Sequence, residues 1–262
     1  MRTIVITGST RGIGLGLAQE FLARECQVVI SGRSQETVNA AIQKLIEKYP
    51  AENIMGCPCD VRELEQVQAL WDRSLAHFGT VDIWINNAGL GTAPANFWTI
   101  PAETTDRIID VNIKGLMHGC QVAIQGMEKQ GAGFIYNLEG LGSDGRHVDR
   151  IATYGTSKRA IAYFTEGLAI ELKNGPVKIG SLSPGMVITD LLMGDYDQDS
   201  QRWQEAKKIF NILADQVETV TPWLVEKMLA NDKNGRRIRW LTTPKIIWRF
   251  ISAPLLKRDP FK

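Results

Sequence analysis

Short apolar runs alternate along the chain with longer stretches that have helical periodicity. The apolar runs are Thr3–Thr7, Gln27–Ser31, Asn53–Cys59, Val81–Ile85, Gly133–Leu138 and Val177–Ser183. Most of them are continuously apolar, as is typical of strands that are buried on both faces of a parallel sheet. The pattern therefore predicts buried parallel strands at these positions.

The stretches between the strands repeat apolar residues with the period of a helix. They are Gly14–Arg24, Gln35–Lys48, Arg62–Phe78, Glu103–Gln130 and Thr153–Lys173. We expect a break near Asn112 in the fourth of them. Alternation of strand and helix predicts right-handed crossovers, so the fold class is α/β: a single Rossmann-type, doubly wound parallel sheet with helices on both faces.

Beyond Gly185 the alternation is looser. The acidic stretch Asp190–Asp199 predicts a mobile loop, and weaker patterns follow it. These are helices at Ser200–Ala214, Thr219–Ala230 and Pro244–Ile251, and a strand at Arg237–Leu241. Ligands of open α/β sheets bind beyond the carboxyl ends of the strands, so we predict a substrate lid at residues 188–232. The whole chain, 1–262, is expected to be one nucleotide-binding domain.

Composition excludes several classes of function. Lys and Arg number 30 against 29 Asp and Glu, so there is no overall basic surface for nucleic acid. The first apolar run is too short for a signal peptide or a membrane span, so we expect a cytoplasmic or otherwise soluble protein. Cys57 and Cys59 lack a second pair or nearby histidines, so we expect buried, reduced thiols and no metal site.

A glycine-rich turn lies between the first predicted strand and the first predicted helix. Glycines allow a sharp turn close to a pyrophosphate, and the following helix presents free N–H groups to the anion. This context predicts dinucleotide binding. The residues predicted to hold the phosphates are Gly8, Ser9, Thr10, Arg11, Gly12, Ile13 and Gly14.

The end of the second strand predicts which dinucleotide binds. NAD sites usually have an acidic residue there, which binds the ribose 2′-hydroxyl. This chain has Arg33 instead, and Arg11 in the glycine turn adds a second positive charge. Guanidinium groups form charge-assisted hydrogen bonds to a 2′-phosphate. The predicted cofactor is therefore NADPH/NADP⁺.

Tyr154 and Lys158 are one helical turn apart at the start of a predicted helix. Residues i and i+4 share a helix face, so both side chains can enter one pocket. A neighbouring ammonium favours the phenolate, and we expect it to lower the pKa of Tyr154 from its ordinary value near 10. This would make Tyr154 a proton donor at neutral pH.

Five motifs in chain order resemble the short-chain dehydrogenase/reductase family. They are the glycine turn, Asn86-Asn87-Ala88-Gly89, Asn112, the pair Tyr154 and Lys158, and the segment Ser183–Thr189. The resemblance covers residues 3–189. It implies an NADP-dependent oxidoreductase, and it implies that the protein forms a dimer or tetramer through its helices at 103–130 and 153–173.

The resemblance also implies roles for individual residues. NADPH delivers hydride to a carbonyl carbon, and Tyr154 donates a proton to the carbonyl oxygen. Lys158 holds the nicotinamide ribose, and Asn112 positions a water in a proton relay. The further residues implied to contact the cofactor are Asp60 and Val61 near the adenine, Asn87, Ala88 and Gly89 on the ribose side, and Pro184, Gly185, Val187 and Thr189 around the nicotinamide.

One departure from the family pattern lies just after the fifth strand. The family usually has a pair of serines there, the second of which polarises the carbonyl, whereas this chain has Glu139 and Gly140. Ser143 is the nearest hydroxyl, so it is the candidate replacement, although a turn serine without a chemical role fits equally. Glu139 is either a second acid near the carbonyl or a charge that ends the strand.

The sequence around this departure is similar to the chlorophyll(ide) b reductase branch of the family. Asn137–Ser143, the following Tyr-Gly-x-(Ser/Thr)-Lys helix and the segment Leu182–Met193 carry the similarity. The implied substrate is a chlorophyll-type tetrapyrrole, whose 7-formyl group is reduced to hydroxymethyl. A macrocycle needs a wide apolar pocket. Candidate lining residues in the lid are Leu191, Leu192, Met193, Phe210, Ile212 and Leu213, although an ordinary helix core fits them too.

The tail, residues 236–262, has eight basic residues and one acid, interspersed with Trp, Ile, Leu and Phe. This composition is typical of an anchor on an anionic lipid surface, which would place the protein peripherally at a photosynthetic membrane. The tail could equally pack on its own domain or on a partner subunit.

Two other functions stay open at this point. One is a general ketone or aldehyde reductase for a small lipid or metabolite. The other is a non-catalytic NADP-binding scaffold, which the missing serine pair favours and the intact Asn112, Tyr154 and Lys158 oppose.

Overall fold

A seven-stranded parallel sheet forms the centre of the computed structural model, which describes residues 1–193, 200–256 and 258–261. The strand order is β3-β2-β1-β4-β5-β6-β9, and all six pairings are parallel. The strands are β1 (Thr3–Ile6), β2 (Gln27–Gly32), β3 (Ile54–Pro58), β4 (Ile83–Asn86), β5 (Gly133–Leu138), β6 (Val177–Ser183) and β9 (Arg236–Arg239). The predicted α/β class and parallel sheet are confirmed.

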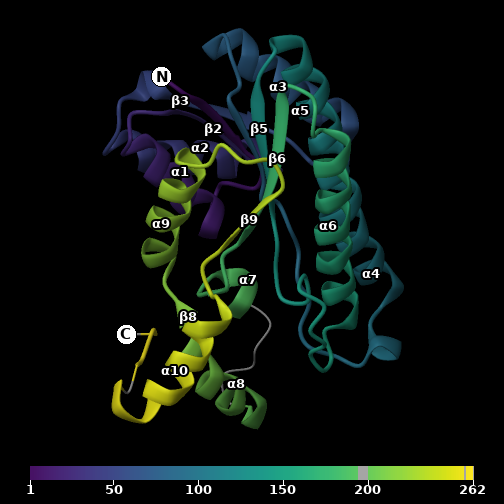
Figure 1. Ribbon diagram of the computed structural model, residues 1–262, viewed down its shortest axis with the longest axis vertical. Coiled ribbons are helices and arrows are strands. Elements are labelled where there is room, and N and C mark those ends of the chain that lie inside the picture. The colour runs from purple at the N-terminus through teal and green to yellow at the C-terminus, as the bar shows by residue number, and fades with distance from the viewer. Residues whose placement is uncertain (194–199, 257, 262) are drawn as a thin grey trace.

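Helices cover both faces of the sheet (Figure 1). They are α1 (Gly12–Leu22), α2 (Gln35–Ile46) and α9 (Val217–Leu229) on one face, and α3 (Leu64–Phe78), α5 (Leu116–Gln130) and α6 (Ala152–Glu171) on the other. Successive β1 residues face opposite cores: Ile4 and Ile6 pack with α1 and α9, whereas Val5 packs with α3 and α5. Each is fully buried, which stabilises the fold by roughly 1.5–3 kcal/mol per side chain.

The α-helix is interrupted near Asn112, as predicted, but by a π-helical segment and not by a loop. The helix α4 (Ala102–Ile109) continues into α5 through the π-helical segment η3 (Asp110–Gly115), which contains Asn112. A π-helical turn inserts an extra residue without ending the helix, so periodicity is disturbed while the helix persists.

Several short elements lack a sequence signal. They are η1 (Ala51–Asn53), η2 (Phe97–Thr99), β7 (Met186–Val187), β8 (Ala214–Asp215) and α7 (Asp190–Met193). The predicted mobile loop at Asp190–Asp199 is wrong for its first four residues, which form α7, and the remainder, 194–199, lies outside the described residues.

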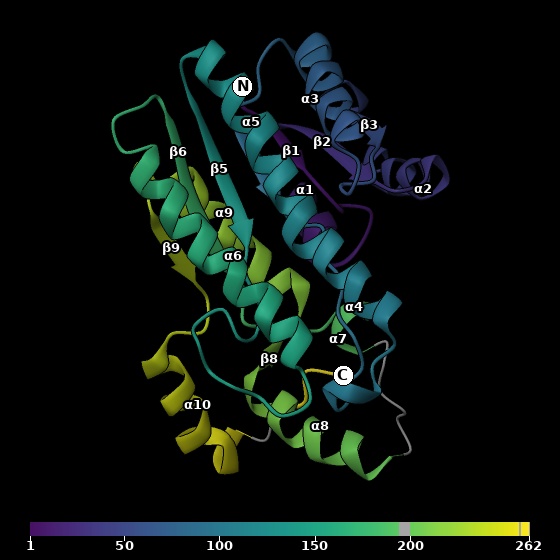
Figure 2. The same cartoon turned by 90° about the vertical axis from the view of Figure 1, so that its right-hand side faces the viewer.

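The segment predicted to be a lid lies below the carboxyl edge of the sheet, where α7, β8, α8 (Gln201–Leu213) and the tail helix α10 (Thr243–Leu256) meet (Figures 1 and 2). Its own small core contains Trp203, Phe210 and Ala214, against which Leu192 and Met193 pack. These side chains therefore hold the segment together. Leu191, by contrast, is 48% exposed.

The tail packs on its own domain through Asp215 of β8. The carboxylate of Asp215 accepts hydrogen bonds from Arg249 (3.0 Å), Arg258 (2.6 Å) and the indole N–H of Trp240 (2.6 Å). The two arginines also donate to backbone carbonyls of Ile212, Leu213 and Ala214.

The outer face of α10 is apolar. Its exposed large side chains are Ile247, Trp248, Phe250, Ile251, Leu255 and Leu256. In the part of the chain that the structure describes, no helix combines the length and apolarity that crossing a membrane requires.

Candidate active site

The glycine turn approaches the end of β4 so closely that side chains are excluded. Gly8 and Gly12 have φ values of 62° and 56°, in the left-handed region that favours glycine. A Cβ on Gly8 would lie 2.8 Å from the Cα of Ala88. The Asn87 amide donates to the carbonyls of Thr7 (2.9 Å) and Gly8 (2.8 Å), which fixes the turn against β4.

The first turn of α1 is free to bind an anion. Its N-cap residue, Arg11, forms no side-chain hydrogen bond to the helix, so the backbone N–H groups of the first turn are available. The side chain of Ser9 points inward instead: its hydroxyl donates to Ile6 O (2.7 Å) and accepts from Ser31 N (2.9 Å). Ser9 therefore braces the turn, and its side chain is not directed at a ligand.

Arg33 is the cation best placed for a 2′-phosphate. It is exposed at the end of β2 and forms no hydrogen bond or ion pair with the residues that the structure describes. Arg11, in contrast, pairs with Asp190 at 3.0 Å. Asp60, predicted to contact the adenine, pairs with Arg62 at 2.6 Å. The hydrogen bonds from Arg62 lower the pKa of Asp60, so it is a carboxylate at neutral pH.

The half-buried side chain of Tyr154 and the buried side chain of Lys158 enter one pocket from the first turns of α6. The Lys158 Nζ lies 5.7 Å from the centre of the Tyr154 ring and donates to Leu138 O at 3.3 Å. The Tyr154 hydroxyl lies against Gly140, where a Cβ would collide with it. The end of β5 thus positions both side chains: the carbonyl of Leu138 binds Lys158, and the backbone of Gly140 contacts the Tyr154 hydroxyl.

Burial dominates the protonation of this pair. It raises the pKa of Tyr154 to about 12, so the predicted lowering of that pKa by Lys158 is wrong for the protein alone. Burial also lowers the pKa of Lys158 to about 8, and the charge of Glu139 opposes that fall. Desolvation disfavours the charged form of either group. Tyr154 is therefore a protonated donor at neutral pH, while Lys158 is close to its titration range.

Asn112 connects the pocket to the chain after β4. Its side chain accepts from Leu90 N (2.7 Å) and donates to Leu90 O (2.9 Å) and to the Ser157 hydroxyl (3.0 Å). A Cβ at Gly89 would lie 3.4 Å from Asn112 Oδ1 and 3.6 Å from Lys158 Nζ. Asn112, Gly89 and Lys158 therefore lie together, as the sequence predicted.

Ser143 lies in a tight turn with Gly140. The Gly140 N–H donates to the Ser143 hydroxyl at 3.0 Å, and the Ser143 N–H donates to Gly140 O at 3.1 Å. Ser143 is buried, and these bonds leave its own hydroxyl proton available. Since Gly140 contacts the Tyr154 hydroxyl, this turn brings Ser143 into the neighbourhood of the proton donor.

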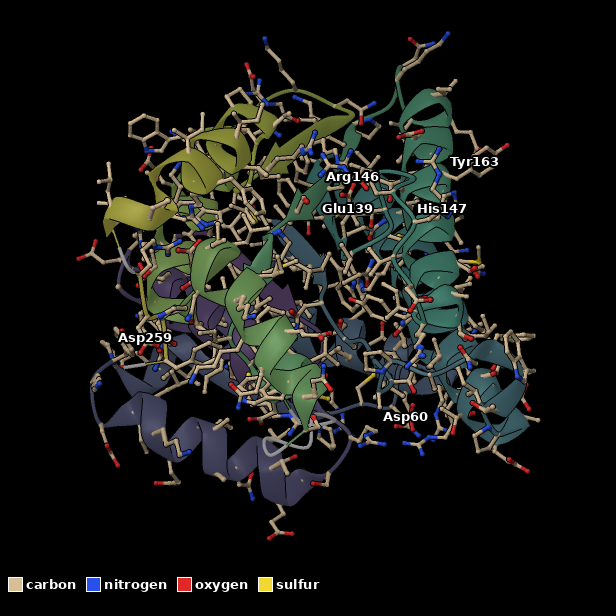
Figure 3. The ribbon with its side chains drawn as sticks, turned by 90° about the horizontal axis from the view of Figure 1, so that it is seen from below. Asp60, Glu139, Arg146, His147, Tyr163 and Asp259 are labelled. Carbon is tan, nitrogen blue, oxygen red and sulfur yellow. The ribbon has the colours of Figure 1, made fainter. Side chains whose placement is uncertain are left out.

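Glu139 is not a free acid. Its carboxylate is buried and accepts from Nε (2.8 Å) and NH2 (2.6 Å) of Arg237 on β9. Figure 3, which views the carboxyl edge from below, places Glu139 in the interior, whereas Tyr163 points outward from α6. Of the two roles predicted for Glu139, the structure supports the charge at the strand end, with a half-buried partner, Arg237, that sequence reasoning missed.

The segment after β6 passes over the glycine turn. Pro184 is buried, and Gly185 adopts a φ of 77°. A Cβ at Gly12 would lie 3.4 Å from a methyl carbon of Thr189, so the predicted phosphate and nicotinamide segments face each other. Pairing of Val187 with Asp215 in the β7–β8 ladder supports this segment from behind.

The rim of the site comprises the chain after β4, the chain after β5, and α7. Sequence reasoning missed most of this rim. The chain after β4 and the chain after β5 are joined by a hydrogen bond from Ala95 N to Arg150 O (2.9 Å), and Leu191 packs near Gly91. Exposed apolar side chains on these segments are Phe97, Trp98, Leu141, Val148 and Leu191. Of these, the sequence marks only Leu191 as a candidate lining residue. No periodic pattern marks the others, because each lies in a loop or a one-turn helix.

Comparisons with known proteins agree with this geometry. The family model described as short chain dehydrogenase matches residues 2–200. Chlorophyll(ide) b reductase NOL, chloroplastic, from Oryza sativa subsp. japonica is 40% identical over 261 residues, which are 95% of this chain and 74% of that protein. The 3alpha-hydroxysteroid dehydrogenase of Mediterraneibacter gnavus is 31% identical over 191 residues, 73% of this chain and 76% of that protein.

A solved structure shows the same architecture with a nucleotide. The structure described as ElxO with NADP bound superposes with a TM-score of 0.79 at 27% identity, covering 91% of this chain and 96% of that one.

Proposed function

Because the chain belongs to the short-chain dehydrogenase family, and is therefore an oxidoreductase, we propose that it is an NADPH-dependent carbonyl reductase that reduces the 7-formyl group of chlorophyll(ide) b to hydroxymethyl. The observation that carries the reductase part is the pair of half-buried Tyr154 and buried Lys158, held against the end of β5. The observation that carries the substrate part is 40% identity to a chlorophyll(ide) b reductase over nearly the whole chain.

The residues around the glycine turn fit a dinucleotide. The backbone at Gly8 and Gly12 leaves room that a side chain would fill, and the first turn of α1 offers free N–H groups. Arg33, just after β2, has no ion-pair partner among the described residues. NADPH supplies the hydride when it is bound. Arg33 would bind its 2′-phosphate, and the segment from Pro184 to Thr189 would bind its nicotinamide end.

Side chains of the protein donate the proton that the carbonyl oxygen takes up during reduction. Tyr154 is protonated at neutral pH and donates from Oη to the carbonyl oxygen as negative charge develops there. Lys158, as an ammonium, stabilises the resulting phenolate. The Asn112 side chain, fixed by Leu90 and Ser157, positions a water for reprotonation. Ser143 would supply the hydroxyl that polarises the carbonyl, in place of the missing serine pair.

A flat apolar substrate suits the rim of the site. Large apolar side chains from three separate segments are exposed there, among them Trp98 at 81% and Leu191 at 48%. An aromatic macrocycle would cover such side chains, whereas a small polar metabolite would leave them in water. We propose that α7, β8 and α8, within the predicted lid at residues 188–232, cover this rim, whereas α9 packs against the sheet and takes no part in the lid.

A general ketone or aldehyde reductase is the second candidate. The 31% identity to a 3alpha-hydroxysteroid dehydrogenase favours it, since that protein's name describes a smaller apolar substrate. A non-catalytic scaffold is disfavoured by the intact pocket around Tyr154.

The deciding experiment is product analysis after incubation of the protein with NADPH and chlorophyllide b, in parallel with a panel of small ketones and aldehydes. We expect 7-hydroxymethyl product from the pigment and slower turnover of the panel. Tyr154→Phe should abolish turnover and retain NADPH binding. Turnover of the panel alone would favour the second candidate, and NADPH binding without turnover of any carbonyl would favour the scaffold.

We also propose that the protein self-associates through α5 and α6, where Tyr163 is 77% exposed and Ile170 is 68% exposed (Figure 3). Light scattering coupled to size exclusion would test for a dimer or tetramer.

The apolar face of α10 would contact a photosynthetic membrane, which flotation with anionic vesicles would test.

A further inference from the structure

Glu139 is a buried carboxylate at a position where the family usually has a neutral hydroxyl. Its side chain is 2% exposed. Burying a charge is unfavourable unless a partner compensates it. A serine or any small polar residue could end the strand without this cost, so the carboxylate calls for a specific explanation.

The partner of Glu139 reaches it across an intervening strand. Ser181 of β6 is paired with Asn137 of β5 on one side and with Arg237 of β9 on the other. Both Nε and NH2 of Arg237 donate to the same oxygen, Oε2 of Glu139, at 2.8 and 2.6 Å. This ion pair fixes the ends of three strands relative to one another.

Glu139 also stands between the two backbone contacts of the active pair. The residue before it, Leu138, accepts from Lys158 Nζ, and the residue after it, Gly140, lies against the Tyr154 hydroxyl. A shift of the Glu139 backbone would therefore disturb both groups. Its own N–H donates to Leu182 O at 2.8 Å, which holds that backbone in place.

We propose that Glu139, fixed by Arg237, is a positioning residue that keeps Lys158 in its ammonium form and presents Tyr154 to the substrate. The proposal rests on the reductase function above. According to this proposal, the carboxylate of Glu139 occupies the position of the family's neutral serine at the end of β5. Ser143, in the neighbouring turn, then polarises the carbonyl.

The surroundings of Lys158 make Glu139 its main charged neighbour. From its own helix Lys158 faces Tyr154, which is neutral at pH 7, and from the side of β4 and η3 it faces the uncharged Gly89 and Asn112. From β5 it faces Glu139, whose partner Arg237 lies on the far side, two strands away. Burial lowers the pKa of Lys158 to about 8, and Glu139 is the group that opposes this fall.

The test is the pH profile of kcat/KM for carbonyl reduction in Glu139→Gln and in the double variant Glu139→Gln/Arg237→Gln. If the single variant folds poorly, the double variant still tests the proposal, because it removes both charges and leaves no unpaired, half-buried arginine. Loss of the ammonium should reduce activity at high pH. We expect the alkaline limb of both variants to move to lower pH by about one unit. Asp144→Asn, in the same β5–α6 loop, is the matched control and should keep the wild-type profile.

A purely structural ion pair would give a different result. Activity would then fall by the same factor at every pH, and the alkaline limb would stay in place. That outcome, in the double variant, would overturn the proposal.

A second readout needs no turnover. Protein labelled with ε-¹³C lysine reports the titration of Lys158 directly by NMR, and Lys158→Arg identifies its signal. We expect this titration to shift downward in Glu139→Gln, and an unchanged titration would overturn the proposal. If the signal shifts but no carbonyl is reduced, the proposed function fails while the electrostatic role of Glu139 stands.

Discussion

The carboxylate of Asp215 is expected to be the most sensitive single point of the lid and tail. Asp215→Asn keeps the shape of the side chain and removes the charge. In the wild-type protein this carboxylate pairs with Arg249 at 2.9 Å and with Arg258 at 2.6 Å. The variant would leave two guanidinium groups around a neutral amide that cannot compensate them.

The expected cost follows from burial. The side chains of Asp215 and Arg249 are 4% and 12% exposed, and that of Arg258 is 30% exposed. Removing one member of a buried ion pair costs about 3–5 kcal/mol. Water can reach part of Arg258, so we expect the lower end, about 3 kcal/mol. For a chain of this size that corresponds to a fall in Tm of about 6–12 °C at neutral pH.

The effect should depend on pH in a defined direction. Burial raises the pKa of Asp215, but the hydrogen bonds from Arg249 and Trp240 and the charges of both arginines outweigh it, so the pKa lies below its usual range. A carboxyl with a lowered pKa stabilises the fold fully above its unfolded value, near 4, and loses that contribution as pH falls through the folded value. The difference between wild type and variant should therefore be constant from about pH 5 to 7 and shrink below about pH 4.

The assay is urea unfolding followed by circular dichroism at several pH values, together with thermal melts. Asp190→Asn is the matched control, since its ion pair with Arg11 is 72% and 74% exposed. Exposed pairs contribute about 0–1 kcal/mol, so the control should change little. Equal losses in the two variants, or a loss at Asp215 that persists unchanged down to pH 3, would refute the reasoning.

Three further substitutions test the candidate site. Arg33→Ala should weaken NADPH binding about 10- to 100-fold and NADH binding far less, as measured by nucleotide fluorescence, and equal losses would show that Arg33 does not bind the 2′-phosphate. Gly140→Ala places a methyl group against the Tyr154 hydroxyl and 3.1 Å from two carbons of the Lys158 side chain, so kcat should fall about 100-fold in steady-state assays; wild-type kcat would contradict the contact. Ser143→Ala should lower kcat/KM about 100-fold or more in steady-state assays, and full activity would make Ser143 a turn residue only.

The sheet and its main helices could be predicted because their signals are long and local. β1 and β5 are continuous apolar runs, and α3 repeats apolar residues with the helical period over 15 residues. Burial on both faces of a parallel sheet requires such runs, so the pattern and the structure have the same cause.

The short elements around the site could not be predicted for the opposite reason. β7 and β8 have two residues each, and their pairing joins Val187 to Asp215, which are far apart in sequence. α7 forms within a stretch whose acidic composition favours a loop. Here tertiary contacts override local preference.

Charge partners were the least predictable feature of the site. The sequence could single out Tyr154, Lys158, Asn112 and Gly89 because family motifs contain them. The pairing of Glu139 with Arg237 depends on β9 lying next to β6, and nothing in either local sequence specifies that neighbour. The same holds for the pKa of Tyr154, which depends on burial that only the folded pocket defines.

The support of the β7 segment by Arg258 has a consequence for how the protein is made. During synthesis the N-terminal strands and the glycine turn emerge first, while Arg258 follows Gly12 by about 12–50 s at ordinary elongation rates. In that interval β8 lacks the guanidinium that anchors its aspartate. The segment that we propose to bind the nicotinamide end would therefore gain its full support only after Arg258 has been synthesised, about 246 residues after the glycine turn.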